Sequence, residues 1–301
     1  MFALWQKGYP AHLGEVWISF DPLAFYARWR TMLRMPAPTI AARATENIIL
    51  PSTFGIAYST IDMRVGVRGL WEVDLNEDDD RIRAVQRVRG LAWTPEGSLL
   101  VASADKLRCF DALGRMEWWW NPPRTFAFVV ACTQAVAYVN GKILVATDDG
   151  EVSILDRQGS TLKRSKEDLT PRWLTTVGNR VVGTDGLNLL AWDMERTSPV
   201  VVRPLPEKAM GFAAGGRYVA TRGMYRALIF DAETLESVAE IKTGGGLPVL
   251  ALHPSRPELA LADVNSAVIV DFMGREIERR PLERHVTALA YWNDLLLTSD
   301  G

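Results

Sequence analysis

A short apolar strand that ends in aspartate recurs along most of this chain at a nearly constant spacing. Successive aspartates of this series are 37 to 45 residues apart. The series consists of Asp74, Asp111, Asp156, Asp193, Asp231 and Asp271. A period of this size is typical of repeat proteins, in which one supersecondary unit cannot bury its faces alone and must stack on its neighbours. We therefore expect a series of similar stacked units.

Each period reads as four short strands separated by turn residues, without helical periodicity. In residues 90–120 the segment Thr94-Pro95-Glu96-Gly97 separates two strands, and the backbone dihedral angles of Pro and Gly suit such a turn. In the next period Asn140-Gly141 and Asp149-Gly150 are strong hairpin signals because these residues tolerate positive φ. Four antiparallel strands in about 40 residues form one blade of a β-propeller.

Two short segments add a family resemblance to this pattern. They are the dipeptide Trp192-Asp193 and the segment His12-Leu13-Gly14-Glu15-Val16, which is followed by Phe20-Asp21-Pro22. With the blade pattern of residues 65–301, they resemble the WD40-like β-propeller family, whose repeats carry such a dipeptide and such a histidine-to-strand segment. Most blades here lack both the tryptophan and the histidine. The resemblance therefore implies a divergent member with an all-β propeller fold.

The last repeat is incomplete at the C-terminus. Residues 285–292 and 295–298 read as its first two strands, and the chain stops at Asp300-Gly301. Phe2-Ala3-Leu4-Trp5-Gln6 offers the missing strand, and counting from Asp271 through Gly301 to Gln6 gives 36 residues, which continues the period. A propeller needs closure because exposed sheet edges invite aggregation. We therefore predict that the two terminal strands share one blade.

The number of blades depends on the segment between Gln6 and Asp74, which is too long for one blade and short for two. Asp21-Pro22 is a good helix start, and Pro36 and Pro38 end the run that begins at Leu23. A helical insertion at about residues 21–36 leaves one blade, which gives seven blades in a single domain of residues 1–301. Eight blades remain open if residues 16–29 are a degenerate pair of strands.

Composition limits the classes of function. The net charge of −2 argues against nonspecific nucleic-acid binding, which requires a basic surface. Cys109 and Cys132 are too few for a disulfide framework, and no segment approaches 18 apolar residues. We expect a cytoplasmic protein without a transmembrane segment.

No pattern of catalytic residues stands out. His12, His253 and His285 have no metal-ligand or nucleophile pattern nearby. Gly244-Gly245-Gly246 reads as a loop between blades, and Glu77-Asp78-Asp79-Asp80 reads as a solvated loop rather than a calcium site. We assign no catalytic residue, cofactor or metal.

Three features are candidate surfaces for a partner. The first is a set of turns that the propeller fold would place on one face, around the mouth of its channel. These turns carry Asp105, Asp148, Asp149, Asp185, Asp263 and Asp300, with Arg222 and Tyr225 interrupting the series. The aspartates are either local turn chemistry or an acidic rim that attracts a basic peptide or a cation.

The second feature is Trp118-Trp119-Trp120 on an outermost strand, where alternation sends Trp119 to the side opposite its neighbours. Either side can pack on the next blade or anchor a partner. The third is the predicted helix, whose apolar face includes Trp29 and whose remainder includes Arg28. It either covers the side of the propeller or docks a partner or a lipid surface.

These observations favour a non-enzymatic protein–protein interaction scaffold of WD40-like type, because a fold alone does not give function and no site chemistry stands out. The alternative is a propeller that binds a small ligand, or acts as a hydrolase, at the mouth of the central channel. The sequence identifies neither the protein partner nor the oligomeric state.

Overall fold

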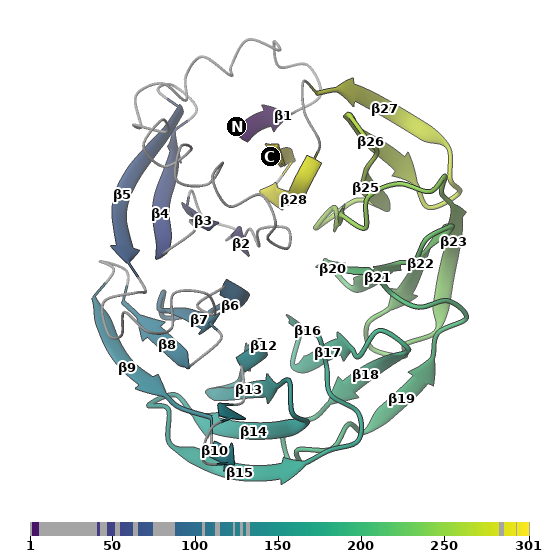
Figure 1. The fold of residues 1–301 in the computed structure, drawn as a ribbon. Coiled ribbons are helices and arrows are strands. Elements are labelled where there is room, and N and C mark those ends of the chain that lie inside the picture. The colour runs from purple at the N-terminus through teal and green to yellow at the C-terminus, as the bar shows by residue number, and fades with distance from the viewer. Residues whose placement is uncertain are drawn as a thin grey trace. The chain divides into compact units, whose positions relative to one another are not determined.

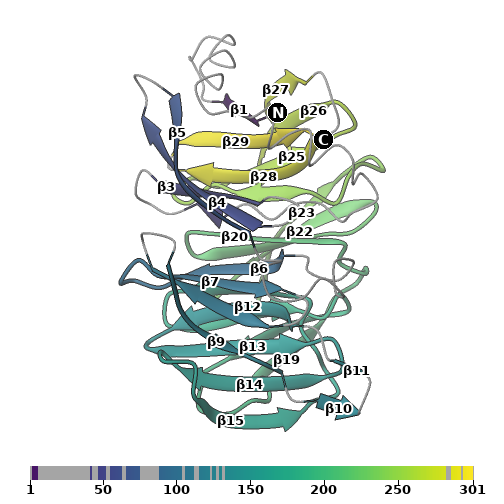
Figure 2. The same ribbon diagram turned by 60° about the vertical axis from the view of Figure 1, so that its left-hand side comes forward.

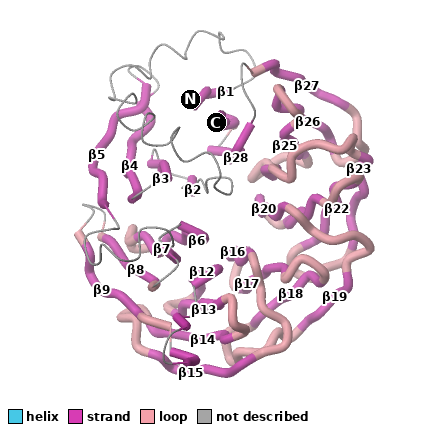
Figure 3. Tube along the Cα trace, viewed as in Figure 1, coloured by secondary structure: helices cyan, strands magenta, loops and turns pink. Residues whose placement is uncertain are grey.

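In the computed structural model, the described residues form 29 strands and no helix (Figure 3). Those residues are 2–5, 41–42, 47–51, 55–62, 66–74, 88–103, 106–111, 115–122, 124–126, 129–130, 133–282, 286–292 and 294–300. The predicted helix at residues 21–36, with its candidate residues Arg28 and Trp29, lies outside them. The chain divides into two compact units, which are described separately below.

The first unit contains residues 1–74, 210–231 and 236–301. Three of its sheets have four antiparallel strands in chain order (Figure 1). They are β2 (Ala41–Ala42), β3 (Asn47–Pro51), β4 (Gly55–Asp62) and β5 (Gly66–Asp74); β20 (Gly211–Gly215), β21 (Tyr218–Arg222), β22 (Arg226–Asp231) and β23 (Ser237–Lys242); and β24 (Leu250–Leu252), β25 (Glu258–Ala262), β26 (Ser266–Asp271) and β27 (Glu276–Pro281).

A fourth sheet of this unit joins the two ends of the chain. Its order is β1 (Phe2–Trp5), β29 (Leu295–Asp300) and β28 (Val286–Trp292), as Figure 2 shows. In the antiparallel register Ala3 lies opposite Thr298 and Leu4 opposite Leu297. The predicted pairing of the first strand with the last is therefore confirmed.

The second unit contains residues 75–209 and 232–235. Its three four-stranded sheets are β6 (Val88–Trp93), β7 (Leu99–Ser103), β8 (Leu107–Phe110) and β9 (Met116–Trp120); β12 (Thr133–Val139), β13 (Lys142–Thr147), β14 (Glu151–Asp156) and β15 (Thr161–Lys166); and β16 (Trp173–Val177), β17 (Arg180–Thr184), β18 (Asn188–Trp192) and β19 (Val201–Pro204). A short pair, β10 (Arg124–Phe126) and β11 (Val129–Val130), precedes β12 and is absent from the predicted pattern.

The recurring aspartate has a structural role at the turn between the third and fourth strands. Oδ1 of Asp156 accepts hydrogen bonds from the backbone N–H groups of Gln158 at 2.9 Å and Ser160 at 2.8 Å. Similar side-chain-to-backbone bonds are made by Asp111, Asp193 and Asp271. Asp is a frequent turn residue because its short side chain bonds to the following backbone in this way. The period in the sequence thus marks a repeated turn.

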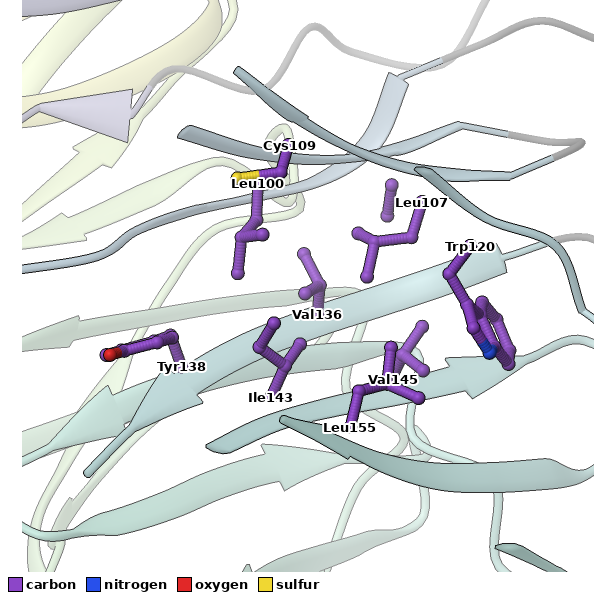
Figure 4. Close-up of a cluster of buried hydrophobic side chains, with 10 residues drawn as sticks. Leu100, Leu107, Cys109, Trp120, Val136, Tyr138, Ile143, Val145 and Leu155 are labelled. Atoms are coloured by element: carbon purple, nitrogen blue, oxygen red, sulfur yellow. The ribbon is translucent and has the colours of Figure 1, made fainter. Parts of the chain in front are cut away.

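Buried side chains between neighbouring sheets hold each unit together. Along β13, Ile143 and Val145 pack in a cluster with residues of β7 and β8 (Figure 4), whereas Leu144 and Ala146 pack in a cluster with residues of β17 and β18. Alternate residues of a strand point to opposite faces, so a strand buried on both faces is apolar throughout. Each such Leu, Ile or Val contributes about 1.5–3 kcal/mol through its burial.

Candidate functional site

The turn between β21 and β22 departs from the other turns at this place in the repeat. Near the end of the second strand, one residue pairs with the start of the third strand. In four other sheets this residue is Ala102, Ala146, Thr184 or Ala262, each fully buried. The equivalent residue here is Arg222, which lies opposite Ala227. Position 222 therefore holds a long cation where four other sheets hold Ala or Thr.

The guanidinium of Arg222 is buried, with 3% of the residue exposed. Its Nη1 donates to the carbonyl oxygens of Ala262 at 2.8 Å and Val249 at 3.1 Å. Nε has no hydrogen-bond partner in the part of the chain that the structure describes. Burial lowers the pKa of Arg222 to about 10, against the opposing influence of Asp263. The positive charge of Arg222 is therefore stabilised by two carbonyl groups and by Asp263, but not by a hydrogen bond at Nε.

A glycine loop passes beside this guanidinium. The backbone N–H of Thr243, directly after β23, donates to the carbonyl of Tyr225 at 2.8 Å, and Gly244-Gly245-Gly246 then leads toward β24. A Cβ at Gly246 would lie 2.6 Å from Nη2 of Arg222, whereas a Cβ at Gly244 or Gly245 would meet nothing within 4 Å. The predicted loop between repeats is confirmed, and only a glycine fits beside the arginine without a shift.

Large apolar side chains are exposed around the same turn. Met210, Met224, Tyr225 and Val264 are 46 to 64% exposed. The backbone N–H of Met210 donates to the carbonyl of Arg222 at 2.7 Å, and Val264 follows Asp263 in the neighbouring turn between β25 and β26. We call Met210, Arg222, Met224, Tyr225 and Val264 the Arg222 surface. Arg222 and Tyr225 are among the residues predicted from the sequence; Met210, Met224 and Val264 are not, although bulky apolar residues in turns were a visible signal.

Two of the predicted rim aspartates, Asp185 and Asp149, make contacts within their own turns. Oδ1 of Asp185 accepts from the backbone N–H groups of Leu187 at 2.7 Å and Asn188 at 2.6 Å. Asp149 accepts from the hydroxyl of Thr147 at 2.5 Å, and Asp148 lies 3.6 Å from the guanidinium of Arg89. The contacts of Asp185 and Asp149 are those of local turn chemistry, whereas Asp148 faces Arg89 of β6, outside its own turn. These three aspartates belong to the second unit, and Asp105 lies outside the described residues.

Asp263, in the first unit, also accepts a hydrogen bond from a backbone N–H and pairs with an arginine. Its carboxylate accepts from the backbone N–H of Val264 at 2.8 Å and from Nη1 of Arg279 at 2.9 Å. These two contacts hold the pKa of Asp263 below its usual value. Asp263 is therefore an ionised partner of Arg279.

The three tryptophans of β9 differ in exposure as the alternation of side chains along a strand predicts. Nε1 of the buried Trp120 donates to the hydroxyl of Thr161 at 3.1 Å, and the ring of Trp118 covers Gly159, where a Cβ would lie 2.6 Å from the ring. Trp119, on the opposite side, is 55% exposed. Trp119 is thus the most exposed of the three rings.

The described ranges contain neither a candidate metal site nor a candidate membrane span. No group of three or more His, Cys, Asp or Glu residues lies close enough there to hold a metal ion. Among those residues there is also no helix of the length and apolar character that a membrane crossing requires.

Comparisons with known proteins agree at the level of fold. No protein-family model and no curated protein matches this sequence. BamB from Moraxella catarrhalis has a similar structure, with a TM-score of 0.57 at 15% identity over 87% of this chain and 96% of that one. The Pan2 WD40 domain of Neurospora crassa has a TM-score of 0.67 at 11% identity over 90% and 91% of the two chains. BBS1N, solved in complex with ARL6DN, has a TM-score of 0.63 at 14% identity over 88% and 90%.

Proposed function

We propose that this chain, a divergent WD40-like β-propeller, is a non-enzymatic scaffold that binds a protein partner through the Arg222 surface. The observation that carries the proposal is the group of four exposed apolar side chains around a turn that departs from the repeat. Exposed apolar residues that gather in one place, rather than lying singly, are typical of interaction sites. A similar fold, BBS1N, was solved in complex with ARL6DN, which supports a protein as the partner class.

Tyr225 is the expected anchor of this surface. It is 64% exposed, and its backbone carbonyl is held by the N–H of Thr243. Aromatic side chains dominate the binding energy of protein interfaces because they bury a large area at a low cost in side-chain entropy. Met224 and Met210 would add adaptable apolar contacts, since unbranched thioether side chains fit irregular surfaces.

The proposal includes the finer architecture of the scaffold. We infer one domain of seven blades, in which the sheet of β1, β29 and β28 forms the blade shared by the two ends of the chain. The six four-stranded sheets and this three-stranded sheet support that count within the described residues. A ring closed in this way would leave no exposed edge between its first and last blades.

Trp119 is a second candidate surface, on the second unit. It lies on β9, the outer strand of its sheet, close in sequence to Met116, which is 47% exposed. An exposed aromatic ring beside an apolar side chain can anchor a partner in the same way. The test of the main proposal therefore includes this position.

Photo-cross-linking would identify the partner and the surface together. The photoreactive residue p-benzoylphenylalanine would replace Tyr225 in one variant and Trp119 in another, each expressed in the cells of origin. The proposal expects the same protein to be captured repeatedly from position 225. Capture from position 119 alone would favour the second surface instead.

Direct binding of the purified partner would then measure the contribution of each side chain. Tyr225→Ser and Met224→Ser should each weaken binding about tenfold or more, because truncating an anchor residue costs about 2 kcal/mol or more and a tenfold loss corresponds to about 1.4 kcal/mol. Met273→Ser is the matched control, since Met273 is 80% exposed in the turn at the other end of β26. Equal affinity of all three variants and the unaltered chain would overturn the proposal.

A further inference from the structure

Arg222 is an exception within its own repeat, and its structural contacts do not account for it. Ala102, Ala146 and Ala262 occupy the same position in other sheets and are fully buried there. The carbonyl of Val249, one of the two acceptors of Arg222, already receives the backbone N–H of Ala262 at 3.0 Å. Because a small residue is sufficient at this position elsewhere, the fold does not require an arginine at position 222.

The free donor of Arg222 lies on the edge that recognises carboxylates. Nη1 is used by two carbonyl groups, whereas Nε has no partner among the residues with described positions. Nε–H and one N–H of Nη2 point in parallel, so this edge can donate one hydrogen bond to each oxygen of a carboxylate. Leaving such a donor buried without a partner costs free energy, so its presence calls for a specific reason.

The charged groups near Arg222 are already paired with one another, and none of the described carboxylates is bonded to Arg222. Asp263 influences it electrostatically but is bonded to Arg279. Arg226, in the same turn region, pairs with Glu240 at 3.0 Å. No ion pair of Arg222 occurs within the described part of the chain. A carboxylate brought in by another molecule would therefore complete the surroundings of this guanidinium.

The glycine loop is the element that covers this edge. Gly246 lies beside Nη2, whereas Gly244 and Gly245 border open space, because a Cβ there would meet no atom within 4 Å. Thr243, at the start of the loop, has a buried hydroxyl without a hydrogen-bond partner in the described residues. Glycine backbone adopts many conformations, so a shift of this loop is less costly than a shift of a packed strand.

We propose that Arg222 is an anchor for a carboxylate side chain, Asp or Glu, in an apolar segment of the protein partner. The carboxylate binds the Nε and Nη2 edge after the loop of residues 244–246 shifts, and the apolar neighbours of the carboxylate rest on Tyr225, Met224 and Val264. This inference rests on the proposed function for the identity of the ligand as a protein. The recognition of a carboxylate by Arg222 can be tested without that partner.

The first experiment observes the Nε–H group directly. Protein labelled with ¹⁵N-arginine would be titrated with N-acetyl-glutamate N-methylamide, and the Arg222 Nε signal assigned by its loss in Arg222→Ala. The inference expects a saturable shift of that signal at millimolar ligand, and none with the capped glutamine analogue. Arg226 is the internal control, because its guanidinium is already paired with Glu240. An unmoved Arg222 signal, or equal shifts with both analogues, would overturn the inference.

The second experiment uses the cross-linked partner. Arg222→Ala should weaken its binding about tenfold or more, as loss of a charge-assisted hydrogen bond predicts. The substitution introduces the residue that other sheets carry, and an unchanged circular dichroism spectrum would verify the fold. Binding that depends on Tyr225 but not on Arg222 would refute the carboxylate anchor and leave the proposed function standing. If the carboxylate shifts the Arg222 signal but no partner binds in a way that depends on Tyr225, the carboxylate anchor would stand and the proposed function would be refuted.

Discussion

Nε2 of His253 lies 3.1 Å from Oδ1 of Asp294, so a buried imidazole links the end of β24 to the turn between β28 and β29. Nδ1 accepts the backbone N–H groups of Ser255 at 3.1 Å and Arg256 at 3.0 Å. Nε–H of Arg256 donates to Nε2 at 3.0 Å, so this nitrogen faces both the Asp294 carboxylate and a guanidinium. The guanidinium of Arg256 lies close to the same nitrogen and therefore opposes a second proton on the ring.

The free energy of unfolding should fall as the pH decreases through the titration of His253. Burial, and then the charge of Arg256, hold the pKa of His253 below its ordinary value of 6.5, although Glu258 and Asp294 oppose this. The unfolded chain therefore binds the proton more tightly, and stability that is fully present above pH 6.5 is lost as the pH drops toward the folded pKa. Denaturant unfolding from pH 7.5 to 5 would measure the loss.

His253→Asn is the matched variant for this test. Its side-chain oxygen can accept the two backbone N–H groups but does not titrate. The variant should therefore depend less steeply on pH than the unaltered chain. Identical pH dependence of the two proteins would show that His253 does not contribute.

Two glycines of the first unit should differ in how much their replacement by alanine changes the free energy of unfolding. A Cβ at Gly211, the first residue of β20, would lie 1.7 Å from the carbonyl oxygen of Pro248, whereas a Cβ at Gly244 would meet nothing within 4 Å. Gly211→Ala should lower the free energy of unfolding by about 1–3 kcal/mol or more, as overpacking does. Gly244→Ala should change it by less than about 0.5 kcal/mol, as a substitution away from close contacts does. Denaturant unfolding of both variants would measure these changes in the free energy of unfolding.

Removal of residues 1–5 should lower the melting temperature and promote aggregation. The deletion removes β1 and leaves the edge of β29 without its ladder partner. Differential scanning calorimetry and light scattering would measure the two effects. A synthetic peptide of residues 1–6 added to the shortened chain should raise the melting temperature again. An unchanged melting temperature after deletion would contradict a stabilising role for the pairing.

The recurring aspartate should matter through its hydrogen bonds rather than its charge. Asp156→Ala removes the acceptor of two backbone N–H groups and should cost about 1 kcal/mol, the usual net value of a hydrogen bond. Asp156→Asn keeps an oxygen in the same place and should cost clearly less. Equal losses in the two variants, measured by denaturant unfolding, would instead assign the role to the charge.

Trp119 and Trp120 should differ sharply despite their adjacency. Trp120→Ala removes a ring from the buried cluster beside Thr161 and should cost about 3–5 kcal/mol. Trp119 is 55% exposed, so Trp119→Ala should leave the free energy of unfolding within about 0.5 kcal/mol. A large loss for Trp119→Ala would show that this ring has a packing role and would weaken its candidacy as a binding surface.

The repeat and its turns were readable in the sequence because they depend on local chemistry. Asn140 and Gly141 both adopt positive φ in the hairpin between β12 and β13, as their residue types predict. Asp156 bonds to backbone groups two and four residues away. The pairing of β1 with β29 was also predictable, since a fixed period reveals which strand the last repeat lacks.

The environment of Arg222 followed only from the tertiary structure. Its acceptors, Val249 and Ala262, are 27 and 40 residues away, and its burial depends on a loop from the following connection. The sequence marked position 222 as an interruption among the aspartate turns but could not show whether its charge faced solvent. Local turn preferences depend on neighbours within about four residues. Burial and pairing of a long side chain depend instead on which distant backbone packs against it.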